Sequence, residues 1–171
     1  MTTTFILRKW QKSDMKNLQK HANNKKIADN LRNAFPRPYS ISDAKAYVNS
    51  VIKTNEEKQC CRAIEIDGEA VGSIGIFLKD DVYSKSAEIG YWLSEQYWNH
   101  GIMTSAVIEM CDYAFSNYDL VRIFAEVYDY NAGSQNVLKK AGFQLEGVLK
   151  KSVYKNYKYY DSYLYALVKN C

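Results

Sequence analysis

The stretch SAEIGYWLSEQYWNHGIMTSAV, residues 86–107, decides the fold class. Its first nine residues read as a strand, and an apolar stripe at helical spacing begins at Ile102. A second strand-like run follows at residues 121–130. The three segments are therefore expected to form a β-α-β unit with parallel strands and a right-handed crossover. Gly101 lies in the connection between strand and helix, at the carboxyl end of a strand, where open α/β sheets bind ligands.

Periodicity and turn signals place the other elements around this unit. Asp67 and Gly68 predict a hairpin, Gly72 and Gly75 indicate a bulge in the strand that follows, and Ser42 is expected to cap a helix. The remaining strands are expected at residues 4–10, 61–66, 70–78, 143–153 and 159–168, and the remaining helices near residues 15–21, 27–31, 42–52 and 131–141. This order indicates a mixed α/β sheet rather than a sandwich or a helical bundle.

Length and composition favour one compact domain over residues 1–171. Hydrophobic residues make up 47% of the chain and charged residues 25%, as in ordinary globular proteins. The formal net charge of +4 is too small to argue for nucleic-acid binding by itself, although it suits a protein that holds an anionic cofactor.

Cysteine usage gives no support for a metal or redox site. The cysteines lie at positions 60, 61, 111 and 171, and no pair has C-x-x-C spacing. The sequence shows no signal peptide and no long apolar stretch. We therefore expect a cytoplasmic protein with reduced thiols, no bound metal and no membrane contact.

The connection around Gly101 has the properties of an anion-binding loop. A helix start leaves its first N–H groups without partners, and the helix dipole adds a partial positive charge there. A glycine lets the backbone approach a bulky anion, so residues 99–104 could form a pyrophosphate cradle made of main chain. The alternative is an ordinary helix start. A P-loop and a three-glycine dinucleotide fingerprint are both excluded by pattern.

Two motifs in this sequence, and the distance between them, resemble those of the GNAT superfamily of acetyl-CoA-dependent N-acetyltransferases. The first is AEIGYWLSEQYWNHGIMTSAV, and the second is N-x-x-S-x-x-V-L-x-K-x-G-F at residues 131–143. Within the superfamily, the sequence is most similar to the RimJ/RimL-like branch, which acetylates protein N-termini, polyamines and other small amines. The resemblance implies an α+β fold with a twisted, mostly antiparallel sheet of about seven strands. Its central parallel crossover is expected to splay apart to hold CoA, with helices on both faces.

The pyrophosphate loop departs from the family pattern [QR]-x-x-G-x-[GA]. Here residues 98–103 read WNHGIM, so Gly101 matches, Trp98 replaces the polar residue and Met103 replaces the second small one. Met103 would narrow the cradle unless its side chain points away while its N–H still donates.

The resemblance also implies which residues hold acetyl-CoA, the expected cosubstrate. The fourth strand would pair with the pantetheine arm through its backbone, Asn131 would contact that arm, and two residues of the following helix would lie near the nucleotide. The full expected set is Trp92, Leu93, Ser94, Trp98, Asn99, His100, Gly101, Ile102, Met103, Thr104, Asn131, Asn136 and Lys139. For Asn131, capping of the next helix is an equally good reading.

Acetyl transfer requires that the amine lose a proton and that the thiolate regain one. By resemblance Glu88 corresponds to the strand-four glutamate that the histone-acetylating branch uses as its base; the alternative is a structural ion pair. Many family members use a tyrosine as the general acid at the position where this chain has Leu138. By resemblance to the RimJ/RimL-like branch, Ser134 is the candidate proton donor instead. Its alternative role is to cap the helix start.

The acceptor amine is less readable from the sequence. By resemblance, the segment NLRNAFPRPYS at residues 30–40 would line its site, with Phe35 and Tyr39 as walls. A proline-stiffened aromatic segment equally fits a surface turn packed on the core.

Three functions are compatible with these patterns. The first is direct transfer of an acetyl group from acetyl-CoA to a primary amine, either a protein N-terminus or a small molecule. The second is a catalytically weakened acyl-CoA-binding domain, for which Met103 and Leu138 are the evidence. The third is a basic RNA-binding module, based on KKSVYKNYKYY at residues 150–160, although lysines that defend a strand edge explain that run as well. Contact with nucleic acid is otherwise expected only through a ribosomal target. The chain is expected to be a monomer or a homodimer.

Overall fold

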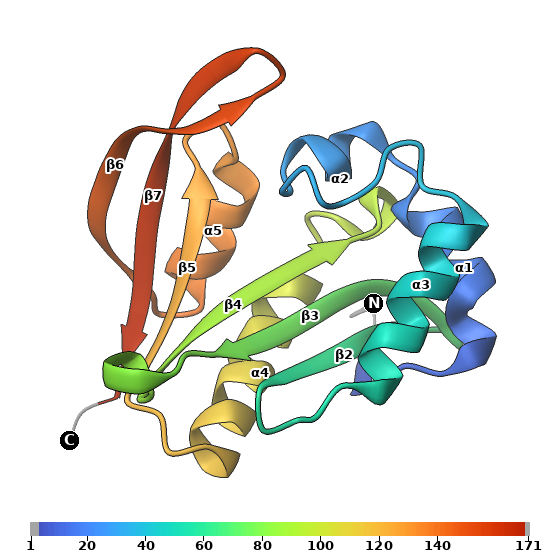
Figure 1. Cartoon of the computed structure of the whole chain (residues 1–171), viewed down its shortest axis with the longest axis horizontal. Helices are drawn as coiled ribbons and strands as arrows, with labels where there is room; N and C mark the ends of the chain where they lie inside the picture. The colour runs from blue at the N-terminus through green and yellow to red at the C-terminus, as the bar shows by residue number, and fades with distance from the viewer. Residues whose placement is uncertain (1–3, 170–171) are drawn as a thin grey trace.

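The protein is built on one seven-stranded sheet with the strand order β1-β2-β3-β4-β5-β7-β6 (Figure 1). The computed structural model describes residues 4–169. The strands are β1 (Ile6–Arg8), β2 (Gln59–Ile66), β3 (Glu69–Leu78), β4 (Ser86–Leu93), β5 (Arg122–Tyr128), β6 (Gln144–Lys155) and β7 (Lys158–Val168). Every neighbouring pair is antiparallel except β4 and β5, which run parallel. The mixed, mostly antiparallel sheet with a central crossover is therefore confirmed.

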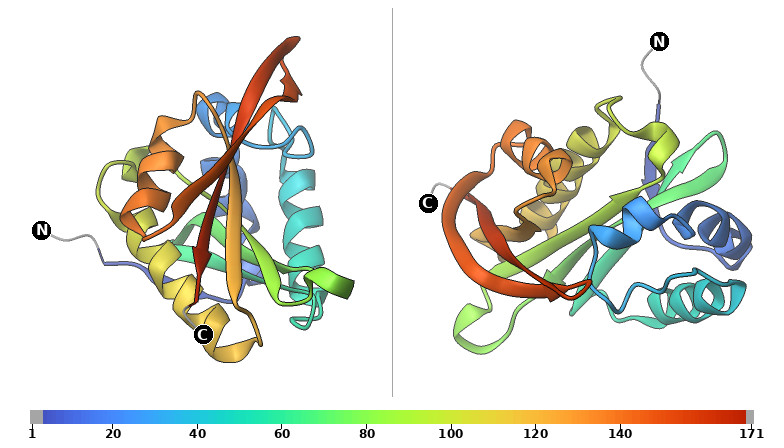
Figure 2. Two further views of the ribbon diagram at one scale, coloured as in Figure 1. Left: turned by 90° about the vertical axis from the view of Figure 1, so that its left-hand side faces the viewer. Right: turned by 90° about the horizontal axis from the view of Figure 1, so that it is seen from above.

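Helices cover both faces of this sheet, as Figures 1 and 2 show. On one face lie α1 (Met15–Ala22), α2 (Lys25–Asp29) and α3 (Ile41–Lys53), and on the other lie α4 (Ile102–Asn117) and α5 (Ala132–Lys140). Short 3-10 turns occur at η1 (Lys12–Asp14), η2 (Asp81–Tyr83) and η3 (Glu95–Tyr97). The sheet is thus the middle of three layers.

The apolar stripe predicted for α4 is buried against the sheet. It consists of Ile102, Ala106, Val107, Met110, Cys111 and Ala114, each at most 3% exposed. These side chains pack with residues from β3, β4 and β5 in the larger of two apolar clusters. Full burial of an aliphatic side chain stabilises a fold by about 1.5–3 kcal/mol, so this stripe fixes the position of α4 and of its N-terminus.

Two local predictions were refined by the backbone. Asp67 and Gly68 both adopt positive φ, as the predicted hairpin turn requires, and the bulge lies beside Gly72, where Val71 is the extra residue opposite β2. The prediction that Ser42 caps α3 was wrong. Ser40 is the cap, because its hydroxyl accepts the Asp43 N–H while the Asp43 carboxylate accepts the Ser40 N–H.

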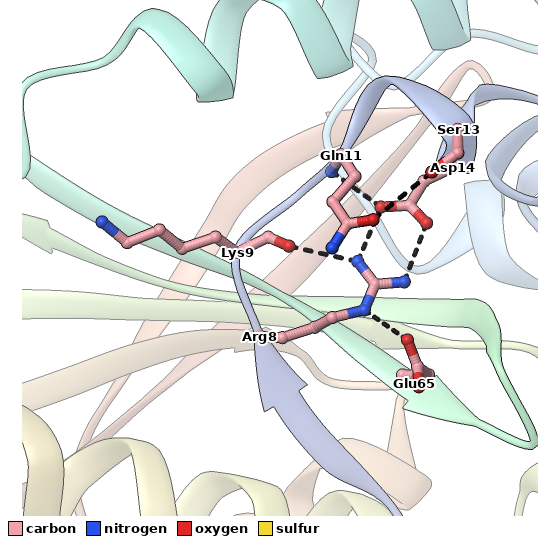
Figure 3. A network of polar contacts seen from close by, with 6 residues as sticks. All are labelled: Arg8, Lys9, Gln11, Ser13, Asp14 and Glu65. Carbon is pink, nitrogen blue, oxygen red and sulfur yellow. Dashed lines mark hydrogen bonds and ion pairs between the residues drawn. The ribbon is translucent and has the colours of Figure 1, made fainter.

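The first strand is joined to η1, which leads into α1, by a partly buried ion pair (Figure 3). Arg8 donates two hydrogen bonds to Asp14, of 2.7 Å and 2.8 Å, and its Nε contacts Glu65 of β2. Asp14 is 3% exposed and also accepts the Gln11 N–H at 2.8 Å. Because these bonds use both carboxylate oxygens and the planar guanidinium, they set the direction in which the chain leaves β1 toward α1.

Among the described helices, none is long and apolar enough to span a bilayer. Cys60, Cys61 and Cys111 are free thiols, and Cys171 lies outside the described residues. Over residues 4–169, the structure gathers no group of three or more His, Cys, Asp or Glu side chains that could hold a metal ion.

Candidate functional site

The site is organised by the separation of β4 from β5. The two strands pair over three residues, Ser86–Glu88 with Arg122–Phe124, and then diverge for the rest of their length. Figure 1 shows β4 and β5 opening from a common base toward the upper part of the molecule. Beyond Glu88, the edge of β4 that faces β5 is therefore open.

The ladder with β3 decides which backbone groups of β4 face this opening. The N–H of Ser94 donates to Val71 O at 2.8 Å, and the other end of the ladder has Lys79 N–H bonded to Ser86 O at 3.1 Å. Even-numbered residues of β4 therefore point their N–H and C=O groups to β3, and odd-numbered ones point theirs to β5. Of the three residues expected to pair with a pantetheine arm, Leu93 has the required direction.

The expectation was wrong for Ser94, and by the same alternation Trp92 also directs its backbone at β3. Tyr91, like Leu93, directs its backbone groups at the opening. The Leu93 carbonyl accepts a 2.7 Å hydrogen bond from the Trp98 indole, which leaves the Leu93 N–H facing the opening. The Ser94 hydroxyl is likewise committed, because it lies 3.0 Å from Nδ1 of the buried His21.

At the wide end of the opening lies the N-terminus of α4. Gly101 adopts φ +77° and precedes the first helical residue, and Asn99 also has positive φ. A Cβ on Gly101 would meet no atom within 4 Å, so the space beside it is open. No side-chain hydrogen bond caps α4 or α1, although η1 runs directly into α1; side-chain oxygens cap α2, α3 and α5. The free N–H groups of this turn lie at the positive end of the helix dipole, which suits an anion.

The large apolar side chains of this loop point away from the free N–H groups at the start of α4. Ile102 and Met103 are 3% and 9% exposed and belong to the apolar cluster under α4, so Met103 does not narrow the cradle. Trp98 also packs against that cluster and ties the loop to the end of β4. The residues that remain exposed or half-buried around the free N–H groups are Asn99, His100, Gly101 and Thr104.

The first turn of α5 lies against β4 and presents two predicted residues. Asn131 caps the helix, because its Oδ1 accepts the Ser134 N–H at 3.1 Å. The Ser134 hydroxyl lies 2.8 Å from the Tyr91 hydroxyl. Asn136 and Lys139 are exposed on the same helix, while Leu138 is completely buried in the core.

On the opposite face of the sheet, Glu88 lies where β4 and β5 part. Its Oε1 accepts a 2.6 Å bond from Arg32 and its Oε2 a 3.0 Å bond from Lys79. The side chain is 19% exposed. The structural ion pair that the sequence left open is thus present, and both carboxylate oxygens are engaged by cations.

The segment between α2 and α3 closes this face over β4. Phe35 contacts Tyr39 and Trp92, with ring centroids 5.0 Å and 6.0 Å apart. Phe35 and Trp92 are half-buried, while Tyr39 is 4% exposed and forms the layer behind them. Burial raises the pKa of Tyr39 to about 12, so its hydroxyl stays protonated at neutral pH.

The β6–β7 hairpin holds the same segment from the other side of the opening. Lys155, which is 7% exposed, donates to Leu31 O at 2.6 Å and to Asn33 Oδ1 at 3.1 Å. Tyr130 follows β5 in the chain, and its hydroxyl donates to Asp29 O. The segment therefore bridges the two halves of the splayed sheet.

Residues 4–144 match the model of the acetyltransferase (GNAT) domain. The chain belongs to the GNAT family. It is 37% identical over 101 residues to the uncharacterized N-acetyltransferase YoaA of Bacillus subtilis, in an alignment that covers 59% of this chain and 56% of YoaA. It is 33% identical over 102 residues to the ribosomal-protein-serine acetyltransferase of Escherichia coli, covering 60% and 56% of the two chains.

The same fold is seen in the structure of the microcin C7 self-immunity acetyltransferase MccE in complex with acetyl-CoA and AMP. The TM-score is 0.83 at 25% identity, and the match covers 96% of this chain and 92% of MccE. Alignments with the first curated relatives span about half of their length.

This GNAT domain carries a carboxylate that the sequence analysis missed. Glu126 lies on β5, on the face shared with Glu88, two residues beyond the last paired position. It is exposed, has no ion-pair partner among the described residues, and lies 3.5 Å from the Ser162 hydroxyl. The residue of β4 at the corresponding level is Gly90, where an added Cβ would lie 3.5 Å from the Phe77 ring. An acidic residue amid the apolar positions of a central strand was the signal in the sequence.

Proposed function

We propose that the protein is an acetyl-CoA-dependent N-acetyltransferase that moves an acetyl group directly to a primary amine. The observation that carries the proposal is the open edge of β4, which runs from the uncapped N-terminus of α4 to the point where β4 and β5 part. This geometry offers an anion site, a run of free backbone groups and an opening to both faces of the sheet. Membership of the GNAT family and the acetyl-CoA complex of MccE support the assignment.

The residues present fit the parts of acetyl-CoA in order. The backbone N–H groups of residues 99–104 suit the pyrophosphate, because they are free and lie at the positive end of α4. Tyr91 would bind the pantetheine arm as a neighbouring strand would. The Leu93 carbonyl is already bonded to Trp98, so its N–H is left for the acetyl oxygen. Asn131 keeps its side-chain amide nitrogen for the arm, and Asn136 and Lys139 would lie near the nucleotide.

On the other face, the acceptor amine would enter between the segment 31–40 and the β6–β7 hairpin. Phe35 and Trp92 form an apolar wall there, with Tyr39 behind them. A protonated amine is attracted both to aromatic faces and to a carboxylate. Glu126 is the carboxylate of this face that no described cation neutralises.

Bound acetyl-CoA supplies an activated acetyl group, and the residues of this chain would direct its transfer. Glu126 takes the proton from the acceptor ammonium, with Glu88 as the second candidate base. The Leu93 N–H, which faces the opening, stabilises the oxyanion. Ser134 gives a proton to the departing sulfur.

The acceptor is a primary amine, either a protein N-terminal α-amine or a small-molecule amine. The E. coli relative named for ribosomal-protein serine supports the protein terminus, and contact with RNA would then be indirect. We further propose that the chain works as a single cytoplasmic domain, as a monomer or a homodimer.

The test is release of CoA thiol from acetyl-CoA over a panel of N-terminal peptides, amino acids and polyamines. Glu126→Gln should lower kcat/KM for the best amine by about tenfold or more, because general base catalysis contributes at least this much. Glu109→Gln is the matched control, since Glu109 is an exposed carboxylate on the outer side of α4. A larger loss in Glu88→Gln would assign the base to Glu88 instead. Binding of CoA without turnover of any amine would contradict the proposal.

A further inference from the structure

A pair of hydroxyl groups joins β4 to α5 across the open side of the splay. The Oη of Tyr91 lies 2.8 Å from Oγ of Ser134 and 3.5 Å from the carbonyl oxygen of the same residue. Tyr91 extends from the face of β4 that packs against α4, and Ser134 lies in the first turn of α5. The contact therefore lies beside the channel proposed for the pantetheine arm.

Either hydroxyl of this pair can be the donor, and the surroundings of Tyr91 allow its phenol to donate. Burial raises the pKa of Tyr91 above its ordinary value, so the phenol keeps its proton throughout the neutral range. Both oxygen atoms within its reach belong to Ser134, and the carbonyl oxygen can only accept. When the phenol donates to Ser134 Oγ, the serine keeps its own proton for another acceptor.

Ser134 is also held at its backbone. Its N–H donates to Asn131 Oδ1 at 3.1 Å, which fixes the first turn of α5. A helical serine commonly turns its hydroxyl to a carbonyl of the preceding turn. In the described structure the hydroxyl of Ser134 is instead hydrogen-bonded to Tyr91.

Leu138 lies one helical turn after Ser134 and has no polar group that could donate a proton beside the channel. Its side chain is fully buried in the core. A hydroxyl near the end of the channel must therefore come from another position, and the fold brings Tyr91 and Ser134 together there.

We infer that Tyr91 is a positioning residue that holds Ser134 as the proton donor to the departing sulfur, an inference that rests on the proposed function. In this step the bond from the neutral amine nitrogen to the acetyl carbon forms, and the carbon–sulfur bond breaks with its electron pair on sulfur. The Ser134 hydroxyl gives its proton to the sulfur. The serine oxygen regains a proton from water, which receives the one that the nitrogen loses. The net change moves one proton from nitrogen to sulfur.

The experiment is a titration of the thiol of CoA bound to the full chain, followed by the ultraviolet absorbance of the thiolate. A donor aimed at the sulfur stabilises the thiolate and lowers the pKa of the thiol. Ser134→Ala and Tyr91→Phe should each raise that pKa by roughly 1, which corresponds to loss of a hydrogen bond to an ionised group. The double variant should match Ser134→Ala, because Tyr91 acts through Ser134.

Tyr47→Phe provides the matched control. Tyr47 lies on α3, and its hydroxyl is 2.8 Å from the Ser73 hydroxyl on the other face of the sheet. Its loss removes the same kind of bond away from the channel, so the thiol should titrate as in the wild type. A wild-type titration in Tyr91→Phe, or additive shifts in the double variant, would overturn the inference. An unchanged titration in Ser134→Ala would do so too. If the wild type fails to bind CoA at all, the proposed function itself fails.

Discussion

Nη2 of Arg32 lies 2.6 Å from Oε1 of Glu88, so the segment after α2 is tied to the residue at which β4 and β5 part. Lys79 holds the other carboxylate oxygen at 3.0 Å from the turn between β3 and β4. One carboxylate thereby connects the wall of the proposed acceptor site to the base of the splay. Because the Arg32 side chain is 74% exposed, this contact is expected to add little to the stability of the whole fold.

Replacement of Arg32 should change the KM for the acceptor amine and leave the KM for acetyl-CoA unchanged. In Arg32→Gln we expect the free energy of unfolding to change by less than about 1 kcal/mol, as for other exposed ion pairs. The KM for the amine should rise, because the segment that carries Phe35 loses its ion pair with β4. The KM for acetyl-CoA should remain unchanged. Steady-state kinetics with each substrate varied in turn measures both.

Lys25→Gln is the control for this prediction. Lys25 pairs with Asp29 within α2, close to the same segment, and this pair does not reach β4. Its kinetics should match those of the wild type. An equal rise of both KM values in Arg32→Gln would show that the ion pair does not act on the acceptor side alone.

A side chain at Gly101 should cost both stability and affinity for CoA. An L-residue at φ +77° is strained by about 1–2 kcal/mol, and no neighbouring atom would obstruct the added Cβ. If the backbone relaxes, the first N–H groups of α4 turn away from the anion. We expect Gly101→Ala to weaken CoA binding by roughly tenfold, equivalent to about 1.4 kcal/mol.

Gly68→Ala separates the two effects. Gly68 has φ +81° and equally open space, and it lies in the β2–β3 hairpin. The variant should lose as much stability as Gly101→Ala, measured by chemical denaturation, and bind CoA normally by calorimetry. Equal losses of affinity in the two variants would argue against a cradle at Gly101.

The elements that were predictable are those whose signal is local. The apolar stripe of α4, the turn at Asp67 and Gly68, and the alternation along β4 each depend on residues close in sequence, and the structure confirms them. The resemblance of two motifs to a family added the splay, which periodicity alone does not encode. Its location is seen in the pairing that stops at Glu88.

The details that failed depend on contacts between distant segments. Whether Ser94 or Tyr91 directs its N–H at the open edge is set by the register with β3, which the sequence does not reveal. The two cations on Glu88 come from a loop 56 residues away and from a neighbouring turn. Glu126 becomes a candidate once β5 is aligned with β4. Register and loop placement are thus the information that the structure adds to the site.

Acid should weaken the fold through Glu56. The Arg62 guanidinium holds the pKa of the Glu56 carboxyl below its usual value, with Lys9 contributing further. A folded-state pKa below the unfolded value of about 4.3 means that the stabilisation is complete above that pH and is lost as the pH falls through the folded value. Glu56→Gln should therefore reduce the free energy of unfolding at pH 7 by at most about 1 kcal/mol, since the carboxylate is partly exposed.

Urea unfolding measured between neutral and strongly acidic pH tests this prediction. The difference between wild type and Glu56→Gln should vanish at the acid end, where the wild-type carboxyl is protonated in both states. Glu57→Gln is the control, because Glu57 is bonded to Asn55 and makes no ion pair among the described residues. A difference that stays constant at every pH would exclude the ion pair as its source.

The thiols of the buried Cys60 and Cys111 and of the half-buried Cys61 should resist alkylation in the folded protein. Burial raises the pKa of Cys61 to about 11 and that of Cys111 to about 12, and it also raises the pKa of Cys60. The thiolate is the reactive form, so at neutral pH these residues should label far more slowly than an ordinary cysteine with a pKa of about 8.5. Peptide mass spectrometry after a short exposure to iodoacetamide reports each position separately. In urea-unfolded protein all three should label at the ordinary rate, because unfolding removes the burial that raised their pKa values. Rapid labelling of Cys61 in the folded chain would contradict the raised pKa of this half-buried thiol.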